Sequence, residues 1–321
     1  MRNIRSILVF HPVLWGLVAL QSLLAAAWIA IDPRISFSPA KVDETAVTLG
    51  ACLLVAAVAL GVQAFKWPVI AERVRVMATG ILFLVLSFTG VRFLNYLSMS
   101  LALPLADDRL DSWDRALGID WHAYASWLGR HTGLLPCLEQ CYGLAAVAIP
   151  FIFMGLVACG RAERAREFAA LLYVGVLVTI VIAAFFPAEG AMVRYIDGGL
   201  PAGTFGDKAG VFFVEALRRV RESDAVVLSF APLPGLASFP SFHTVIGLLI
   251  VYACRDNIVT LLLAALGAGA ILLATPVYGG HYFIDVIAGF ALTVVLAAAC
   301  AAVRAADHPR MSAVAAREAL P

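Results

Sequence analysis

Long apolar runs are the feature of this sequence that most constrains how the chain folds. A helix that crosses a bilayer needs roughly 20 apolar residues, and its backbone polar groups must be satisfied within the helix itself. The runs cover residues 7–31, 45–65, 76–103, 134–159, 167–186, 241–254, 258–278 and 282–303. They predict an all-α, polytopic membrane helix bundle of about eight spans, of which the run at 241–254 is the shortest.

The composition agrees with a membrane protein and excludes several other classes. Hydrophobic residues make up 62% of the 321 residues and charged residues 14%, against roughly 45–50% and about 25% in soluble domains. A net charge of +1 provides no basic field to attract nucleic acid. None of the six cysteines forms a CxxC pair, so we expect neither a disulfide framework nor a zinc site. The first run exceeds the roughly 7–15 residues of a signal-peptide core, which favours an uncleaved first helix.

Lysine and arginine gather in alternate short loops between the runs, and acidic residues gather in the others. Basic short loops stay in the cytoplasm, so we expect both termini inside and segments 104–133 and 187–240 outside. Both segments contain aromatic and apolar residues, and 209–222 is amphipathic; they predict helical outer-face loops that roof the site. The expected division is 1–103 for N-terminal membrane helices, 104–303 for a catalytic membrane domain and 304–321 for a cytoplasmic tail.

Two short motifs carry the candidate catalytic side chains. The first, SFPSFHT, begins at Ser238 and contains His243; the second, TPVYGGHYFID, contains His281 and ends at Asp285. The two runs at 241–254 and 258–278 predict a helical hairpin between the motifs, which returns the chain to the same membrane face. Both histidines are therefore expected on the outer side, at helix N-termini.

This arrangement suits the chemistry of a phosphate ester. A helix N-terminus offers free N–H groups and a positive dipole end to an oxyanion, and Gly279 and Gly280 let the backbone approach it closely. His281 and Asp285 are four residues apart, so they would share a helical face. The carboxylate would hold one imidazole nitrogen as N–H and leave the other as a nucleophile. His243 would complete an acid–base pair.

Other interpretations of these residues remain open. The spacing of His281 and Asp285 also suits a helix-stabilising pair, and the glycines suit close packing of helices. Together with His243, these residue types can bind zinc, although the sequence has no HExxH motif. We expect no metal and no cofactor. The spans also fit a transporter, but the polar groups cluster at one face and no inverted repeat is evident.

The two motifs resemble those of the type 2 phosphatidic acid phosphatase superfamily of membrane lipid phosphatases and phosphotransferases. FPSFHT followed by GGHYFID is similar to the inositol phosphorylceramide synthase-like branch, as is DRALGIDW at 114–121. The resemblance covers roughly residues 107–303. It implies that His281 is a nucleophile that forms a phosphohistidine, that Asp285 orients this histidine, and that His243 protonates the leaving alkoxide.

The sequence departs from the wider superfamily where phosphate-binding cations are expected. A Ser-Arg pair precedes the nucleophile in that pattern, whereas Ala274 and Thr275 stand here, and no clear Lys-x6-Arg-Pro motif is present. The branch commonly departs at the same place. Arg92, inside the third run, could face the pocket or pair with a backbone carbonyl. The candidate phosphate-binding residues lie in the motifs and the preceding outer loop: Ser241, Gly279, Gly280, Arg194 and Arg218.

The sequence thus predicts an integral membrane enzyme that cleaves a phosphoester of a phospholipid or other lipid phosphate. A lipid hydroxyl as acceptor, such as that of ceramide or diacylglycerol, would give transfer of an inositol phosphate-like headgroup. Water as acceptor would give a phosphatase that acts on phosphatidic acid or a polyprenyl pyrophosphate. We expect a multi-pass protein of the inner membrane, with its site on the periplasmic face and no nucleic-acid partner.

Overall fold

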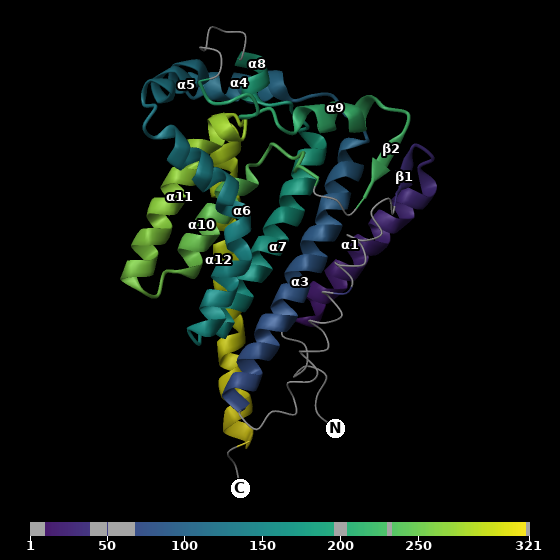
Figure 1. Ribbon diagram of the computed structural model, residues 1–321. Coiled ribbons are helices and arrows are strands. Elements are labelled where there is room, and N and C mark those ends of the chain that lie inside the picture. Colours follow the sequence, from purple (N-terminus) through teal and green to yellow (C-terminus); the bar gives the residue numbers. More distant parts are fainter. Residues whose placement is uncertain (1–9, 39–49, 51–67, 196–203, 230–232, 319–321) are drawn as a thin grey trace.

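The computed structural model describes residues 10–38, 50, 68–195, 204–229 and 233–318. Within these ranges six helices are long and apolar enough to cross a membrane, and a seventh apolar helix is shorter. They stand side by side as a bundle (Figure 1), as expected for an all-α membrane protein. In chain order they are α1 (Pro12–Ile31), α3 (Pro68–Met99), α6 (Leu135–Ala158), α7 (Ala162–Phe185), the shorter α10 (Phe242–Ala253), α11 (Ile258–Tyr278) and α12 (Phe283–Glu318).

These helices correspond to seven of the predicted spans, and the predicted span at 45–65 lies outside the described residues. Several helices extend beyond their apolar runs. Helix α7 begins at Ala162 rather than 167, and α3 begins at Pro68 rather than 76. The added turns are rich in charged residues, whose long side chains reach polar surroundings while the backbone stays helical. Helix α12 likewise continues beyond 303 into the predicted tail.

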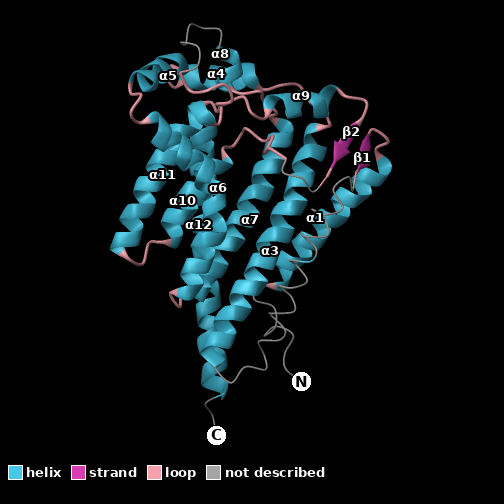
Figure 2. Ribbon diagram, viewed as in Figure 1, coloured by secondary structure: helices cyan, strands magenta, loops and turns pink. Residues whose placement is uncertain are grey.

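Four short helices lie across one end of the bundle (Figures 1 and 2) and form the predicted roof. They are α4 (Asp107–Ala116), α5 (Trp121–Arg130), α8 (Ala191–Tyr195) and α9 (Val214–Glu222). The amphipathic stretch 209–222 becomes helical from Val214, and its buried face consists of Val214, Leu217 and Val220. Two three-residue strands, β1 (Ile35–Phe37) and β2 (Val226–Leu228), pair in parallel beside α9.

The interior of the bundle is closed by large side chains from α3, α6 and α7. Phe83, Phe153, Phe168 and Tyr173 are completely buried, and the Phe83 and Tyr173 rings meet edge to face at 5.4 Å. Apolar side chains on the outside of α11 are exposed instead, as expected of a surface that faces lipid rather than water. This packing fixes the long helices relative to one another and so positions the end that carries the motifs.

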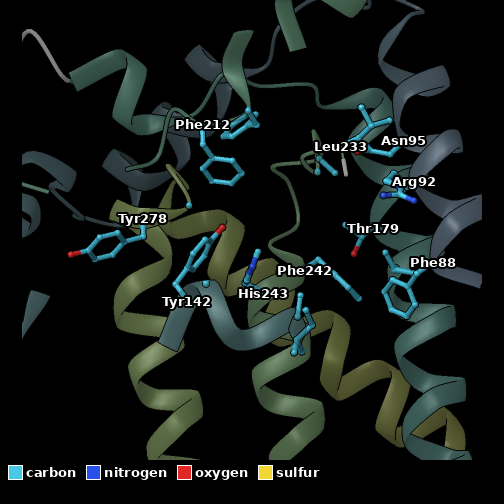
Figure 3. Close-up of a pocket in the computed structure, with 18 of the residues that line it drawn as sticks. Phe88, Arg92, Asn95, Tyr142, Thr179, Phe212, Leu233, Phe242, His243 and Tyr278 are labelled. Atoms are coloured by element: carbon cyan, nitrogen blue, oxygen red, sulfur yellow. The ribbon is translucent and has the colours of Figure 1, made fainter. Parts of the chain in front are cut away.

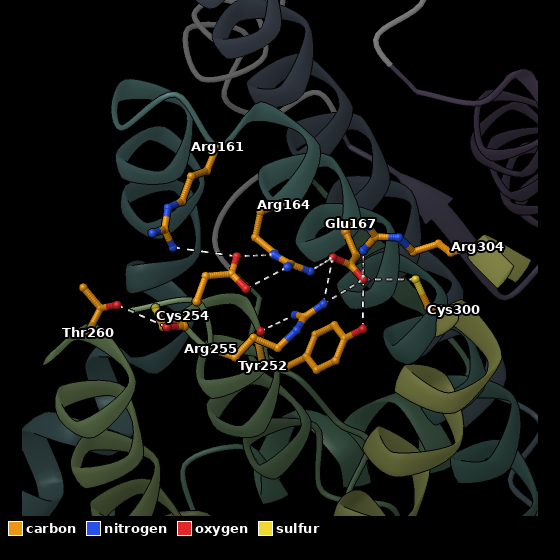
Figure 4. Close-up of polar contacts among 10 residues, drawn as sticks. Arg161, Arg164, Glu167, Tyr252, Cys254, Arg255, Thr260, Cys300 and Arg304 are labelled. Atoms are coloured by element: carbon orange, nitrogen blue, oxygen red, sulfur yellow. Dashed lines mark hydrogen bonds and ion pairs between the residues drawn. The ribbon is translucent and has the colours of Figure 1, made fainter. Parts of the chain in front are cut away.

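A cluster of charged residues ties α7, α10 and α12 together at the end of the bundle opposite the roof (Figure 4). Its centre is Glu167 on α7, whose side chain is only 7% exposed. The carboxylate accepts hydrogen bonds from Tyr252 (2.9 Å) and Arg304 (3.1 Å), and its further partners are Arg164, Arg255 and Cys300. Because the partners lie on different helices, this one carboxylate links three elements.

Replacing Glu167 by alanine is expected to lower the free energy of unfolding by about 3 kcal/mol, because it leaves several partly buried arginines without their shared carboxylate. Denaturant-induced unfolding in detergent measures this change. Glu163→Ala is the matched control: it lies one turn away, is 82% exposed and pairs only with Arg166 among the described ion pairs. The free energy of unfolding of Glu163→Ala should fall by less than about 0.5 kcal/mol. Equal losses in the two variants would contradict the role given to Glu167.

Candidate active site

The α10–α11 hairpin brings both motifs to the roofed end of the bundle, where they border one large cavity. The cavity has a volume of about 1180 Å³ and is lined by both His243 and His281. Apolar side chains of α3, α6 and α7 form much of its wall, and polar side chains line it both at the histidines and at Arg92 and Thr179 (Figure 3). Representative apolar residues of this wall are Ile81, Leu84, Phe88, Ile149, Val176 and Ile180.

His281 and Asp285 form the predicted pair, although not on one helical face. Helix α12 begins only at Phe283, so His281 precedes it. Asp285 is the third residue of the helix, and its Oδ2 reaches back to the backbone N–H of Tyr282 (3.1 Å) and to His281 Nδ1 (3.0 Å). An acidic side chain at this position commonly caps a helix in this way. The cap, rather than helical spacing, therefore brings carboxylate and imidazole together.

Ser238 is a third member of this hydrogen-bonded group. Its hydroxyl donates to Asp285 Oδ2 (2.9 Å) and lies 3.4 Å from His281 Nδ1. All three side chains are buried. With Asp285 accepting from Nδ1–H, the other ring nitrogen, Nε2, carries the lone pair. The motif therefore contributes Ser238 as a positioning group, a role that the sequence alone did not assign.

His243 is the second residue of α10, and Tyr142 of α6 fixes the plane of its ring. The two rings stack with centroids 4.0 Å apart and planes inclined by 21°, as seen at the centre of Figure 3. Gly279 makes this close arrangement possible. A Cβ at Gly279 would lie 2.6 Å from the Tyr142 hydroxyl and 2.5 Å from Cδ2 of His281. The absence of a side chain at this position therefore lets both histidines border the same space.

Three glycines meet where the roof contacts the second motif. Gly280 has a φ of +69°, and its carbonyl accepts from the N–H of Ala191 (2.7 Å). A Cβ on Gly280 would overlap the carbonyl oxygen of Gly210, and one on Gly190 would overlap that of Gly280. Here glycine serves close packing of the roof against the loop that carries His281, and the left-handed backbone favours glycine as well.

Aspartates of α4 hold the start of α12 in place. Asp114 accepts hydrogen bonds from the N–H groups of Phe283 and Ile284, both at 2.7 Å. These first N–H groups of a helix have no partner within it. Asp107 similarly accepts from the N–H of Gly190 (2.8 Å) and from the Tyr282 hydroxyl (3.1 Å). Burial raises the pKa of Asp114 to about 6, while the two backbone N–H groups oppose that rise.

The function of this acidic segment was not predicted, although a signal was present. From the sequence, the acidic residues between 107 and 120 indicated only the outer side of the membrane, and 114–121 resembled a segment of the family. In the structure, Trp121 of the same segment donates from Nε1 to the carbonyl of His281 (3.1 Å). Asp114 and Trp121 thus support the loop that carries His281 from the roof side.

Of the five candidate phosphate-binding residues, one lines the cavity and the other four do not. Gly279 lines the cavity, whereas Ser241 is fully buried and caps α10 by accepting from the N–H of Thr244 (3.4 Å). Arg218 and Arg194 do not line the large cavity. Arg218 pairs with Glu189, and Arg194 pairs with Asp108 and Asp111. Both guanidinium groups are therefore bound to carboxylates of the roof. Gly280 packs against the roof and is likewise absent from the cavity lining.

No group of three or more His, Cys, Asp or Glu side chains in the described ranges is arranged to hold a metal ion. The chemistry available at the site is that of two imidazoles, one oriented by a buried carboxylate. An imidazole with a free lone pair is a nucleophile or a base, and a neighbouring imidazole can carry a proton to or from the reacting group.

Comparison with known proteins places this site in a family. Residues 108–299 match the model of the PAP2 superfamily, which covers more than half of the chain and includes both motifs and the α4 segment. No curated protein and no solved structure gives a match. The chain therefore belongs to the PAP2 superfamily and is a membrane enzyme of the phosphatase or phosphotransferase type.

Proposed function

We propose that this protein cleaves a phosphoester of a lipid by double displacement through a phosphohistidine on His281. Nε2 of His281 attacks phosphorus, and the P–O bond to the leaving alkoxide breaks while His243 gives that oxygen its proton. A second hydroxyl then attacks phosphorus and returns a proton to His243 as the N–P bond breaks. The observation that carries this proposal is the buried Ser238–Asp285–His281 arrangement, whose Ser238 and His281 line the cavity.

The shape and lining of the cavity support a lipid as substrate. Its volume of about 1180 Å³ exceeds the roughly 300–1,000 Å³ of ordinary small-molecule pockets. The histidines and many apolar side chains of α3, α6 and α7 line the same cavity. A phosphate group at the histidines would thus leave its apolar chain among residues of the spanning helices.

The acceptor distinguishes the two forms of the proposal. The similarity of both motifs to the inositol phosphorylceramide synthase-like branch favours transfer of a phosphoryl headgroup to a lipid hydroxyl, with ceramide or diacylglycerol as acceptor. The alternative is hydrolysis of a lipid phosphate such as phosphatidic acid or a polyprenyl pyrophosphate. Both share the first displacement and differ only in which hydroxyl attacks the phosphohistidine.

Purified protein in mixed micelles tests the choice. Headgroup-labelled phospholipids are supplied with and without ceramide or diacylglycerol, and the label is followed by thin-layer separation. Transfer predicts that label moves to a new lipid only when the acceptor is present, with ping-pong kinetics. Release of water-soluble phosphate without acceptor identifies a phosphatase instead. Label movement that survives His281→Ala would contradict both forms.

We further propose that the roofed end faces the periplasm across the inner membrane. The basic residues of the roofed end lie in long segments, whereas the short loops and helix starts at the other end carry the basic residues that favour the cytoplasmic side. They include Arg73, Arg75, Arg161, Arg164, Arg166 and Arg255.

Two cysteines near opposite ends of α6 report the orientation directly. Cys137 lies at the roofed end and Cys159 follows the other end, and both are exposed. In variants that keep one cysteine, a membrane-impermeant maleimide added to spheroplasts should label Cys137 and spare Cys159 until the membrane is permeabilised. Early labelling of Cys159 with protection of Cys137 would reverse the orientation.

A further inference from the structure

We propose that Arg92, Asn95 and Thr179 form the subsite that binds the anionic phosphoryl group of the substrate. These residues come from α3 and α7 and border the cavity that contains the histidines. They gather on one side of it, across from Tyr142 (Figure 3). The inference rests on the proposed function in one respect, since it takes the substrate to be a lipid phosphate.

Charge within the cavity points to Arg92. Among the described residues that line the cavity, Arg92 and Lys208 are the lysines and arginines. Lys208 is exposed in the roof loop, whereas Arg92 is half-buried within the spanning helix α3. An arginine at such a position is costly in a membrane and generally faces a polar site. Arg194 and Arg218 of the roof pair with carboxylates and do not line the cavity, whereas Arg92 lines it from a spanning helix.

The neighbours of Arg92 along α3 show which way it faces. Phe88, Arg92 and Asn95 are spaced so that they share one face of the helix. The Phe88 ring lies 6.2 Å from that of Phe242, and Asn95 Oδ1 accepts from the N–H of Leu236 (2.7 Å). Both contacts are with the segment that leads through Ser238 to His243. Arg92 therefore lies between two contacts to the catalytic segment and on the face turned towards it.

Two buried donors beside Arg92 lack partners in the described protein. The hydroxyl of Thr179 is in a side chain that is 1% exposed, and Nδ2 of Asn95 is in one that is 4% exposed; neither has a hydrogen-bond partner there. Leaving a buried donor unsatisfied is unfavourable. Both residues line the cavity, so an acceptor in the cavity would satisfy them.

The chemistry of this set matches a phosphoryl group. A guanidinium, an amide N–H and a hydroxyl are all hydrogen-bond donors, and together they carry one positive charge. Phosphate oxygens accept several such bonds, and the planar guanidinium binds two of them at once. This subsite would supply the cation that is missing where Ala274 and Thr275 replace the family's Ser-Arg pair.

Binding without turnover tests this subsite separately from the nucleophile. The probe is a short-chain phosphonate analogue of phosphatidic acid, which has carbon in place of the bridging ester oxygen and cannot be cleaved there. Diacylglycerol with the same chains reports binding of the apolar part alone. Equilibrium binding of both is measured to the full-length protein in detergent, as wild type, Arg92→Gln, Arg92→Lys and Thr179→Val. Arg219→Gln is the matched control, since it removes a 68% exposed arginine of α9 outside the cavity.

Arg92→Gln should weaken phosphonate binding about tenfold or more and leave diacylglycerol binding unchanged. Thr179→Val should weaken phosphonate binding by a smaller factor, and Arg219→Gln should change neither. Unchanged phosphonate affinity in folded Arg92→Gln, or equal losses for both ligands, would overturn the proposal. If Arg92→Gln does not fold, Arg92→Lys and Thr179→Val decide: wild-type phosphonate affinity in both rejects the subsite. If label movement survives His281→Ala while the Arg92 and Thr179 variants still lose phosphonate affinity, only the proposed mechanism is rejected and the subsite stands.

Discussion

Replacing His281 by alanine should lower turnover of a lipid phosphoester by about 10⁴-fold or more, the size of effect seen when a nucleophile is removed. The reason lies in the geometry: Asp285 and Ser238 hold the Nδ1 side of the imidazole, and the other nitrogen remains available for attack. The same variant should form no covalent phosphoenzyme after exposure to phosphate-labelled lipid. Turnover and retention of label on denatured protein measure the two effects independently.

Two further histidine variants separate this role from a general loss of structure. His131→Ala, at the exposed end of α5, should retain activity and label. His243→Ala should slow formation of the phosphoenzyme about 10²- to 10⁴-fold with an alkyl ester, and much less with a nitrophenyl ester, whose leaving group needs no proton. Loss in His281→Ala should be the same for both esters. A His281→Ala protein that still becomes labelled would place the nucleophile elsewhere.

Gly280→Ala is expected to be the most damaging change that leaves every catalytic side chain in place. A left-handed backbone conformation costs a non-glycine residue about 1–2 kcal/mol, and the new Cβ would also overlap the Gly210 carbonyl. The loop that carries His281 must then move away from the roof. Because a displacement of about 1 Å can cost 10²-fold in rate, we expect at least that loss in kcat together with a lower Tm.

Gly118→Ala is the matched control for this prediction. Gly118 has nearly the same φ, +72°, but a Cβ there would meet no atom within 4 Å. Gly118→Ala should therefore lose only the stability that a left-handed backbone costs a non-glycine residue, and its kcat should stay close to that of the wild type. The difference between the two variants measures the close approach of the roof to the His281 loop. Similar kcat values for both would show that this contact does not position the nucleophile.

The candidate site was predictable to the extent that it depends on residues near each other in sequence. The apolar hairpin between the two motifs indicated that His243 and His281 would return to one face, and both line the same cavity. The pairing of His281 with Asp285 also followed from local spacing, although the helix begins later than expected and capping forms the contact. Ser238 was visible in the first motif, but its bond to Asp285 spans 47 residues and could not be assigned.

The arginines predicted to bind phosphate show most clearly how little nearness in the sequence says about contacts in the fold. Arg194 and Arg218 were favoured because they precede His243 in the outer loop, yet their guanidinium groups pair with Asp108, Asp111 and Glu189. Arg92 lies far away in the sequence and borders the cavity instead. Ion pairing depends on which side chains packing brings within reach, and composition alone contains no such information.

The sequence by itself determined the membrane bundle, the hairpin and the return of His243 and His281 to one face. The length of an apolar run and the spacing of residues within it are properties of one segment of chain. The spans and the hairpin follow from them and can therefore be predicted from the sequence. Only the tertiary structure decided that Asp114 and Trp121 hold the His281 loop and that α3 completes the cavity. These contacts join segments up to 170 residues apart. They exist because buried N–H groups and charges must find partners wherever packing of the helices makes them available.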